Sequence, residues 1–214
     1  LAPTRPALWL SVLLTLALVI PLGPLVYRLA FQPIADATVL TLFIAAIGVH
    51  FAMIGLGLIF FGAEGFRTEP FIAGLFPVGP LMFKGQSLVI LAVTAALLGG
   101  LWFFFEHSML GKALRATAIN RLGARLVGIP TRATGRIAFA LAAAIGALSG
   151  TLIGSLTTIS YDSGFIISLK GFVAAIAAGL ASYPLTVAAA ILVGVLESFS
   201  AFFASAYKEV IVFS

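Results

Sequence analysis

The sequence predicts an all-α fold, a polytopic transmembrane helical bundle of about six to seven membrane segments. Of the 214 residues, 62% are apolar and 9% are charged, whereas an ordinary soluble domain carries about 25% charged residues. The apolar stretches are continuous rather than alternating, which excludes a transmembrane β-barrel. We therefore expect residues 1–214 to form a single transmembrane domain with no soluble domain.

Four apolar stretches are long enough to cross about 30 Å of hydrocarbon. They are residues 7–27, 37–61, 87–105 and 137–160. Two shorter apolar pieces follow, 169–181 and 185–197, and they are either tilted spans or partly inserted helices. A further apolar run begins near residue 205 and stops with the sequence. Because the chain also starts at Leu1 rather than at an initiator methionine, we expect it to be an internal piece of a longer membrane protein.

The most basic part of the chain is the segment 106–136, between the third and fourth predicted spans. It holds six of the twelve cationic side chains: Lys112, Arg115, Arg121, Arg125, Arg132 and Arg136. Because successive spans alternate in direction, Arg28 lies on the same side, so that seven of the twelve cations share one face. The positive-inside rule assigns this face to the cytoplasm.

The middle of the basic segment predicts a short amphipathic helix at about 116–128. Its apolar and cationic side chains fall on different helical faces: Ile119, Leu122 and Leu126 on one, Arg121 and Arg125 on another. Gly128 followed by Pro130 predicts where this helix ends. A helix with a defined end favours docking of a partner protein. The alternatives are a solvated loop and a helix lying on anionic lipid.

Composition also excludes several other function classes. No basic patch is interleaved with aromatic residues for base stacking, so nucleic acid is not an expected partner. The chain has no cysteine and only two histidines, His50 and His107, so no metal site is expected. It shows no nucleophile elbow, no phosphate-binding glycine loop and no paired carboxylates on one helix face. We therefore expect neither an enzyme nor a cofactor bound by this chain.

Ionisable and small residues within the spans are further candidates. His50 and Lys170 are candidates for lining a translocation pathway, because ionisable residues inside a membrane are functional by default. The alternatives are a hydrogen-bonded packing histidine and a lysine that reaches the membrane interface, as Glu197 would also do. A stripe of small residues recurs every four positions: Gly146, Gly150 and Gly154. It predicts close helix packing, either within the chain or at a subunit interface.

The residues GKALRATAINRLGARLVGI (111–129) resemble the cytoplasmic loop of the branched-chain amino-acid ABC permeases of the LivH type. In bacterial ABC importers that loop carries Glu-Ala-Ala, three residues and then Gly, and it forms the coupling helix that enters a groove of the ATPase subunit. Ala124 and Gly128 match this motif. Leu122 stands in place of its Glu and Gly123 in place of its first Ala. Weaker likenesses follow the order of the family at 61–70, 168–180 and 205–213.

The resemblance implies the permease subunit of an ATP-driven importer in the bacterial inner membrane, for branched-chain or related amino acids or small amides. It implies two ATPase subunits that bind the ATP, a second permease subunit, a periplasmic binding protein and surrounding membrane lipid. The predicted coupling residues are Arg121 and Arg125 as electrostatic guides, with Leu122, Ala124, Leu126 and Gly128 as contact face and helix stop. The family's N-terminal portion and the end of its last helix would lie outside this sequence.

Two other functions stay open. One is an ATP-independent transporter or channel. The other is a membrane scaffold whose basic loop binds anionic lipid.

Overall fold

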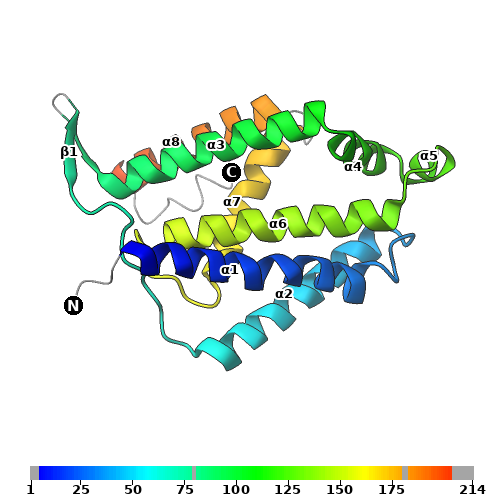
Figure 1. Ribbon diagram of the computed structural model, residues 1–214, viewed down its shortest axis with the longest axis horizontal. Coiled ribbons are helices and arrows are strands. Elements are labelled where there is room, and N and C mark those ends of the chain that lie inside the picture. Colours follow the sequence, from blue (N-terminus) through cyan, green and yellow to red (C-terminus); the bar gives the residue numbers. More distant parts are fainter. Residues whose placement is uncertain (1–4, 79–80, 180–182, 204–214) are drawn as a thin grey trace. The chain divides into compact units, whose positions relative to one another are not determined.

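The computed structural model describes residues 5–78, 81–179 and 183–203, within two compact units, Leu1–Ile159 and Ser160–Ser214. The first unit contains α1 (Arg5–Val26), the π-helix η1 (Tyr27–Phe31), α2 (Val39–Phe61), β1 (Leu75–Val78), β2 (Leu81–Lys84), α3 (Gly85–His107), α4 (Met109–Ile119), α5 (Arg121–Leu126) and α6 (Thr131–Ile153), as Figure 1 shows. The second unit contains α7 (Ser163–Ala177) and α8 (Tyr183–Phe203). The predicted all-α class is confirmed.

Five helices in the described part of the chain are long and apolar enough to cross a membrane: Leu8–Phe31, Val39–Phe61, Gly85–His107, Thr131–Ile153 and Leu185–Phe203. A sixth apolar helix, α7, has only 15 residues. The chain is thus a multi-pass membrane protein, as predicted. The predicted start of a further helix at 205–213 lies outside the described residues.

The two short apolar pieces near the end of the chain differ from each other. The piece predicted at 185–197 belongs to α8, which continues to Phe203 and so becomes long enough to span. The piece predicted at 169–181 belongs to α7, which ends at Ala177. By length, α8 is sufficient for a span and α7 is shorter than one. The choice between tilted spans and partly inserted helices stays a prediction.

The predicted fourth span, 137–160, is displaced in the structure. α6 begins at Thr131, directly after Pro130, and ends at Ile153. Part of the segment predicted as a basic loop is therefore helical, because arginines at the start of a helix do not interrupt it. Residues 154–159 instead form a turn after α6.

That turn is bonded to the long connection between α2 and α3. The Thr68 N–H donates to the Gly154 carbonyl at 2.9 Å, and Phe66 pairs with Ile159 in a β-bridge. Further along the same connection, β1 and β2 form an antiparallel hairpin in which Leu75 pairs with Lys84. The bonds between the turn and this connection join segments that are far apart in sequence, so hydropathy gave no sign of them.

Helices α1 and α6 run side by side (Figure 1) and approach closely at glycines other than the predicted stripe. A Cβ atom on Gly23 would overlap the backbone carbonyl of Phe139, and one on Gly135 would overlap the ring of Tyr27. At Gly146 and Gly150, by contrast, a Cβ would meet no described atom within 4 Å. Their predicted packing within the chain is therefore not observed in the part that the structure describes.

The third member of the predicted stripe is packed, although against a turn rather than another helix. A Cβ on Gly154 would lie 3.3 Å from Oγ1 of Thr68 and 3.3 Å from Cδ1 of Ile159. The interface alternative for Gly146 and Gly150 stays a prediction.

Candidate functional site

The basic segment folds into two short helices rather than one. α4 ends at Ile119, α5 starts at Arg121, and Asn120 between them has an extended backbone (φ −147°, ψ 98°). The Asn120 side chain accepts a hydrogen bond from the Gly123 N–H at 2.8 Å. It therefore caps α5 and interrupts the helix before it. The predicted single helix at about 116–128 is wrong, because this side chain replaces a backbone carbonyl as the hydrogen-bond acceptor.

The end of α5 is closed by a glycine in the left-handed conformation. Gly128 has φ +82°, and its N–H donates to the Arg125 carbonyl at 3.0 Å. The Ile129 N–H donates to the Ala124 carbonyl at 2.9 Å. These two bonds form a Schellman motif. The predicted helix stop is thus confirmed, and α5 is a six-residue helix with a cap at each end.

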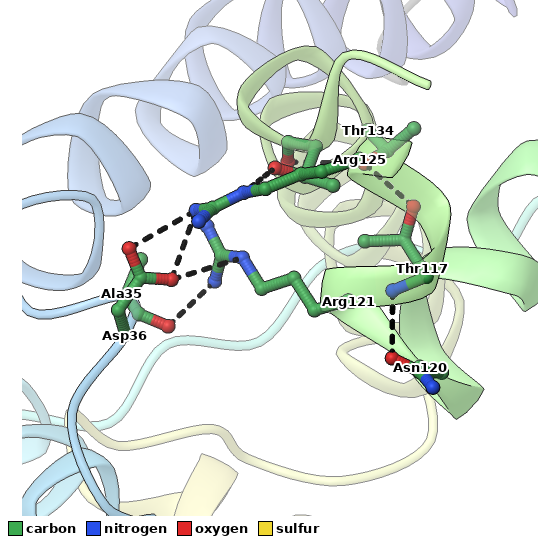
Figure 2. Close-up of polar contacts among 9 residues, drawn as sticks. Ala35, Asp36, Thr117, Asn120, Arg121, Arg125 and Thr134 are labelled. Carbon is green, nitrogen blue, oxygen red and sulfur yellow. Dashed lines mark hydrogen bonds and ion pairs between the residues drawn. The ribbon is translucent and has the colours of Figure 1, made fainter. Parts of the chain in front are cut away.

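The cationic side chains of α5 hold it against the connection between η1 and α2 (Figure 2). Nη1 of Arg121 donates to the Ala35 carbonyl at 2.7 Å. Nη2 of Arg125 donates to both carboxylate oxygens of Asp36, at 2.9 and 3.1 Å. Nε of Arg125 also donates to Oγ1 of Thr131, the first residue of α6, at 3.1 Å. α5 is therefore anchored to two other elements of the first unit.

The two predicted electrostatic guides thus already have partners within the chain. Asp36 was not among the predicted site residues, and no local motif marks it. Its one sequence signal was that alternating spans place the connection after Arg28 on the same side as the basic segment. A role of Arg121 and Arg125 toward a partner protein stays a prediction, and Arg125 keeps 40% of its side chain exposed for it.

A second face of α5 is apolar and uncovered in the described chain. Leu122 is 68% exposed and Leu126 is 81% exposed, and the neighbouring Val127 is exposed as well. Ala124 is only 3% exposed, so it does not belong to the contact face for which it was predicted. The methyl group of Ala124 points into the first unit, where a larger side chain would have to displace its neighbours.

α4 connects α5 to two of the long helices. Nη1 of Arg115 lies 3.0 Å from Oε2 of Glu106 in the last turn of α3, and Nη2 donates to the Phe105 carbonyl at 2.6 Å. On its other side, Oγ1 of Thr134 in α6 donates to Oγ1 of Thr117 at 3.2 Å. Thr134 is buried. α4 thus links α5 to both α3 and α6 through side-chain contacts.

The two candidate pathway residues have different surroundings. His50 lies in α2, half-buried, with its ring centroid 5.5 Å from that of Phe51. Lys170, in the middle of α7, forms an ion pair with Glu197 of α8, with Nζ 2.6 Å from Oε1. The two side chains therefore pair with each other within the second unit, and whether they reach the membrane interface stays a prediction. A pathway role for either candidate stays a prediction.

Known proteins are similar to this sequence along most of its length. BraD of Pseudomonas aeruginosa, a high-affinity branched-chain amino acid transport system permease protein, is 28% identical over 198 residues, which are 89% of this chain and 64% of BraD. The permease protein LivH of Salmonella typhimurium is 29% identical over 194 residues, 87% of this chain and 63% of LivH. LivH of Escherichia coli K12 is 28% identical over the same extent.

The chain thus spans a little under two thirds of the length of these relatives. No solved structure matches it significantly. The family model described as "Branched-chain amino acid transport system / permease component" matches residues 1–214. The match covers the whole sequence, including the basic segment with α4 and α5. The chain belongs to the family of branched-chain amino acid transport permease components.

Proposed function

We propose that this chain is the membrane-spanning subunit of an ATP-driven importer of branched-chain or related amino acids, or small amides, in the bacterial inner membrane. The similarity to the branched-chain amino acid permease proteins BraD and LivH supports the transport class and the substrate class. The single structural observation that carries the proposal is α5, a helix capped at both ends, anchored through its arginines and presenting uncovered leucines.

α5 is the element that docks on an ATPase subunit. Leu122 and Leu126 are mostly exposed, and fully burying a leucine side chain contributes about 1.5–3 kcal/mol. Two such side chains supply several kcal/mol to an interface without any new charge pair. This is sufficient for a helix-in-groove contact of moderate affinity. The Leu122 side chain, where the family has Glu, makes the contact at this position apolar.

The docked helix transmits motion because it is not a flexible loop. The Arg115–Glu106 ion pair ties α4 to α3, and the Thr134–Thr117 hydrogen bond ties α4 to α6. When the ATPase subunits close on ATP, displacement of α5 biases the helix bundle between two arrangements. Two ATPase subunits, a second permease subunit and a periplasmic binding protein complete the importer. ATP binds to the ATPase subunits, and this chain holds no cofactor.

The proposal is tested with the full-length subunit and its partner subunits in proteoliposomes. Leucine uptake is expected to require internal ATP and the external binding protein together. Leu126→Asp is expected to weaken ATPase association about 100-fold or more, because it replaces an apolar contact by a charge in a desolvated groove. Leu126→Met is the matched control and is expected to retain association, since it conserves volume and polarity.

Two results would overturn the proposal. Leucine uptake that proceeds without ATP would show an ATP-independent transporter. Normal ATPase association of the Leu126→Asp subunit would show that α5 is not the docking element.

A further inference from the structure

One pocket in the first unit gathers four arginines around a single carboxylate. Its volume is about 350 Å³, and it is lined by Arg28, Gln32, Pro33, Ala35, Asp36, Arg121, Arg125 and Arg132. Four cations and one anion leave a net charge of +3 at the walls. The volume would hold roughly ten water molecules at about 30 Å³ each. The pocket therefore has both the charge and the room for an anionic group.

Two of these arginines, Arg28 and Arg132, keep their hydrogen-bonding capacity available, whereas the other two are ion-paired with Asp36. Arg121 and Arg125 share the Asp36 carboxylate. Within residues 5–78, 81–179 and 183–203, the guanidinium groups of Arg28 and Arg132 make no hydrogen bond or ion pair. Nε of Arg121 is buried and has no hydrogen-bond acceptor among the described residues, since Asp36 Oδ1 is 3.7 Å away. Several donors are thus in place for an acceptor that the chain does not supply.

The position of the two available arginines indicates which anion they meet. Arg28 lies in the last turn of the membrane helix Leu8–Phe31, and Arg132 is the second residue of the membrane helix Thr131–Ile153. Both are therefore at the level where a span leaves the hydrocarbon, which is the level of lipid phosphates.

We propose that this pocket, which we call the four-arginine pocket, binds the phosphate of an anionic phospholipid headgroup. Arg28 and Arg132 are the primary ligands, each donating to phosphate oxygens, and the Nε of Arg121 is a third donor. Arginine suits this task because its planar fork matches phosphate geometry. Basic pockets between membrane helices on the cytoplasmic side are suited to such headgroups. The assignment goes beyond the proposed transport function and depends on neither substrate nor ATPase.

The test measures binding of phosphatidylglycerol to the full-length subunit in phosphatidylcholine nanodiscs, for the unmodified chain and for Arg28→Gln and Arg132→Gln. Each substitution is expected to lower the apparent affinity roughly five- to tenfold, the effect of removing one cation at an anionic lipid site. The matched control is Arg136→Gln, which removes the same charge one turn further along α6 and outside the pocket. It is expected to change the affinity less than twofold, an order-of-magnitude limit for a charge without direct contact.

Three results would overturn the proposal. An equal loss with Arg136→Gln would show a diffuse positive surface instead of a site. Binding of inorganic phosphate that is lost in Arg28→Gln and Arg132→Gln, while phosphatidylglycerol binding is unchanged in both variants, would show a site for a free anion. Unchanged lipid binding, together with loss of ATPase association in Arg28→Gln and Arg132→Gln, would assign the pocket to an acidic residue of a partner protein. Circular dichroism of each variant checks that the helices are retained. Retention is expected, because the side chains of Arg28 and Arg132 make no hydrogen bond or ion pair within the described chain.

Discussion

Asp36 is the residue on which the placement of α5 depends most directly, and Asp36→Ala removes its carboxylate. The substitution abolishes the two hydrogen bonds from Nη2 of Arg125, at 2.9 and 3.1 Å, and the longer ion pair with Arg121. It leaves the bond from Arg121 to the Ala35 carbonyl and the bond from Arg125 to Thr131 in place. α5 is therefore expected to loosen without detaching.

The size of this effect is set by the exposure of the pair. Hydrogen bonds to charged groups contribute about 1.5–3 kcal/mol when they are shielded from water. The side chain of Asp36 is 68% exposed and that of Arg125 is 40% exposed, so screening reduces the contribution to about 1 kcal/mol. That free energy corresponds to a roughly fivefold increase in the population of the state in which α5 is released.

Hydrogen exchange measures this release directly. Amides of α5 and of its C-terminal cap, Gly128 and Ile129, are expected to exchange about fivefold faster in Asp36→Ala. Amides of α4 serve as the internal control, because α4 is held by the separate contacts of Arg115 and Thr117. Unchanged exchange in α5, or an equal increase in α4, would refute the reasoning that Asp36 anchors this one helix.

Two further experiments test packing and pairing. Gly23→Ala is expected to destabilise the protein by about 1–3 kcal/mol, since the added methyl overlaps the Phe139 backbone. Gly48→Ala, where a Cβ meets nothing within 4 Å, is expected to be neutral or slightly stabilising. Equal unfolding midpoints of the Gly23→Ala and Gly48→Ala variants in denaturing detergent would contradict the packing argument. Lys170→Met is expected to cost about 2 kcal/mol by removing the cation that lies 2.6 Å from the Glu197 carboxylate, whose side chain is 29% exposed. The double variant Lys170→Met with Glu197→Met is expected to recover much of that loss. A double variant that unfolds as readily as Lys170→Met alone would show that the pair does not couple α7 to α8.

Prediction from sequence succeeded where the determining interactions are local. The membrane class follows from continuous apolar stretches, and four of the predicted spans appear as long helices. The stop at Gly128 follows from one residue that tolerates a positive φ. The break at Asn120 was equally local, and an N-capping side chain in the middle of an amphipathic pattern was the available signal.

The sequence by itself determined that this chain crosses the membrane repeatedly, roughly where four of its long helices lie and where its positive charge gathers. Only the tertiary structure decided which side chains meet. Arg125 bonds to Asp36, 89 positions away, and Lys170 to Glu197, 27 positions away. It also decided that Gly23 allows α1, and Gly135 allows the adjoining η1, to approach α6 closely. The physical reason is the separation along the sequence over which each interaction acts. Hydropathy and capping act within a helical turn or span, whereas these pairs depend on which helices pack together.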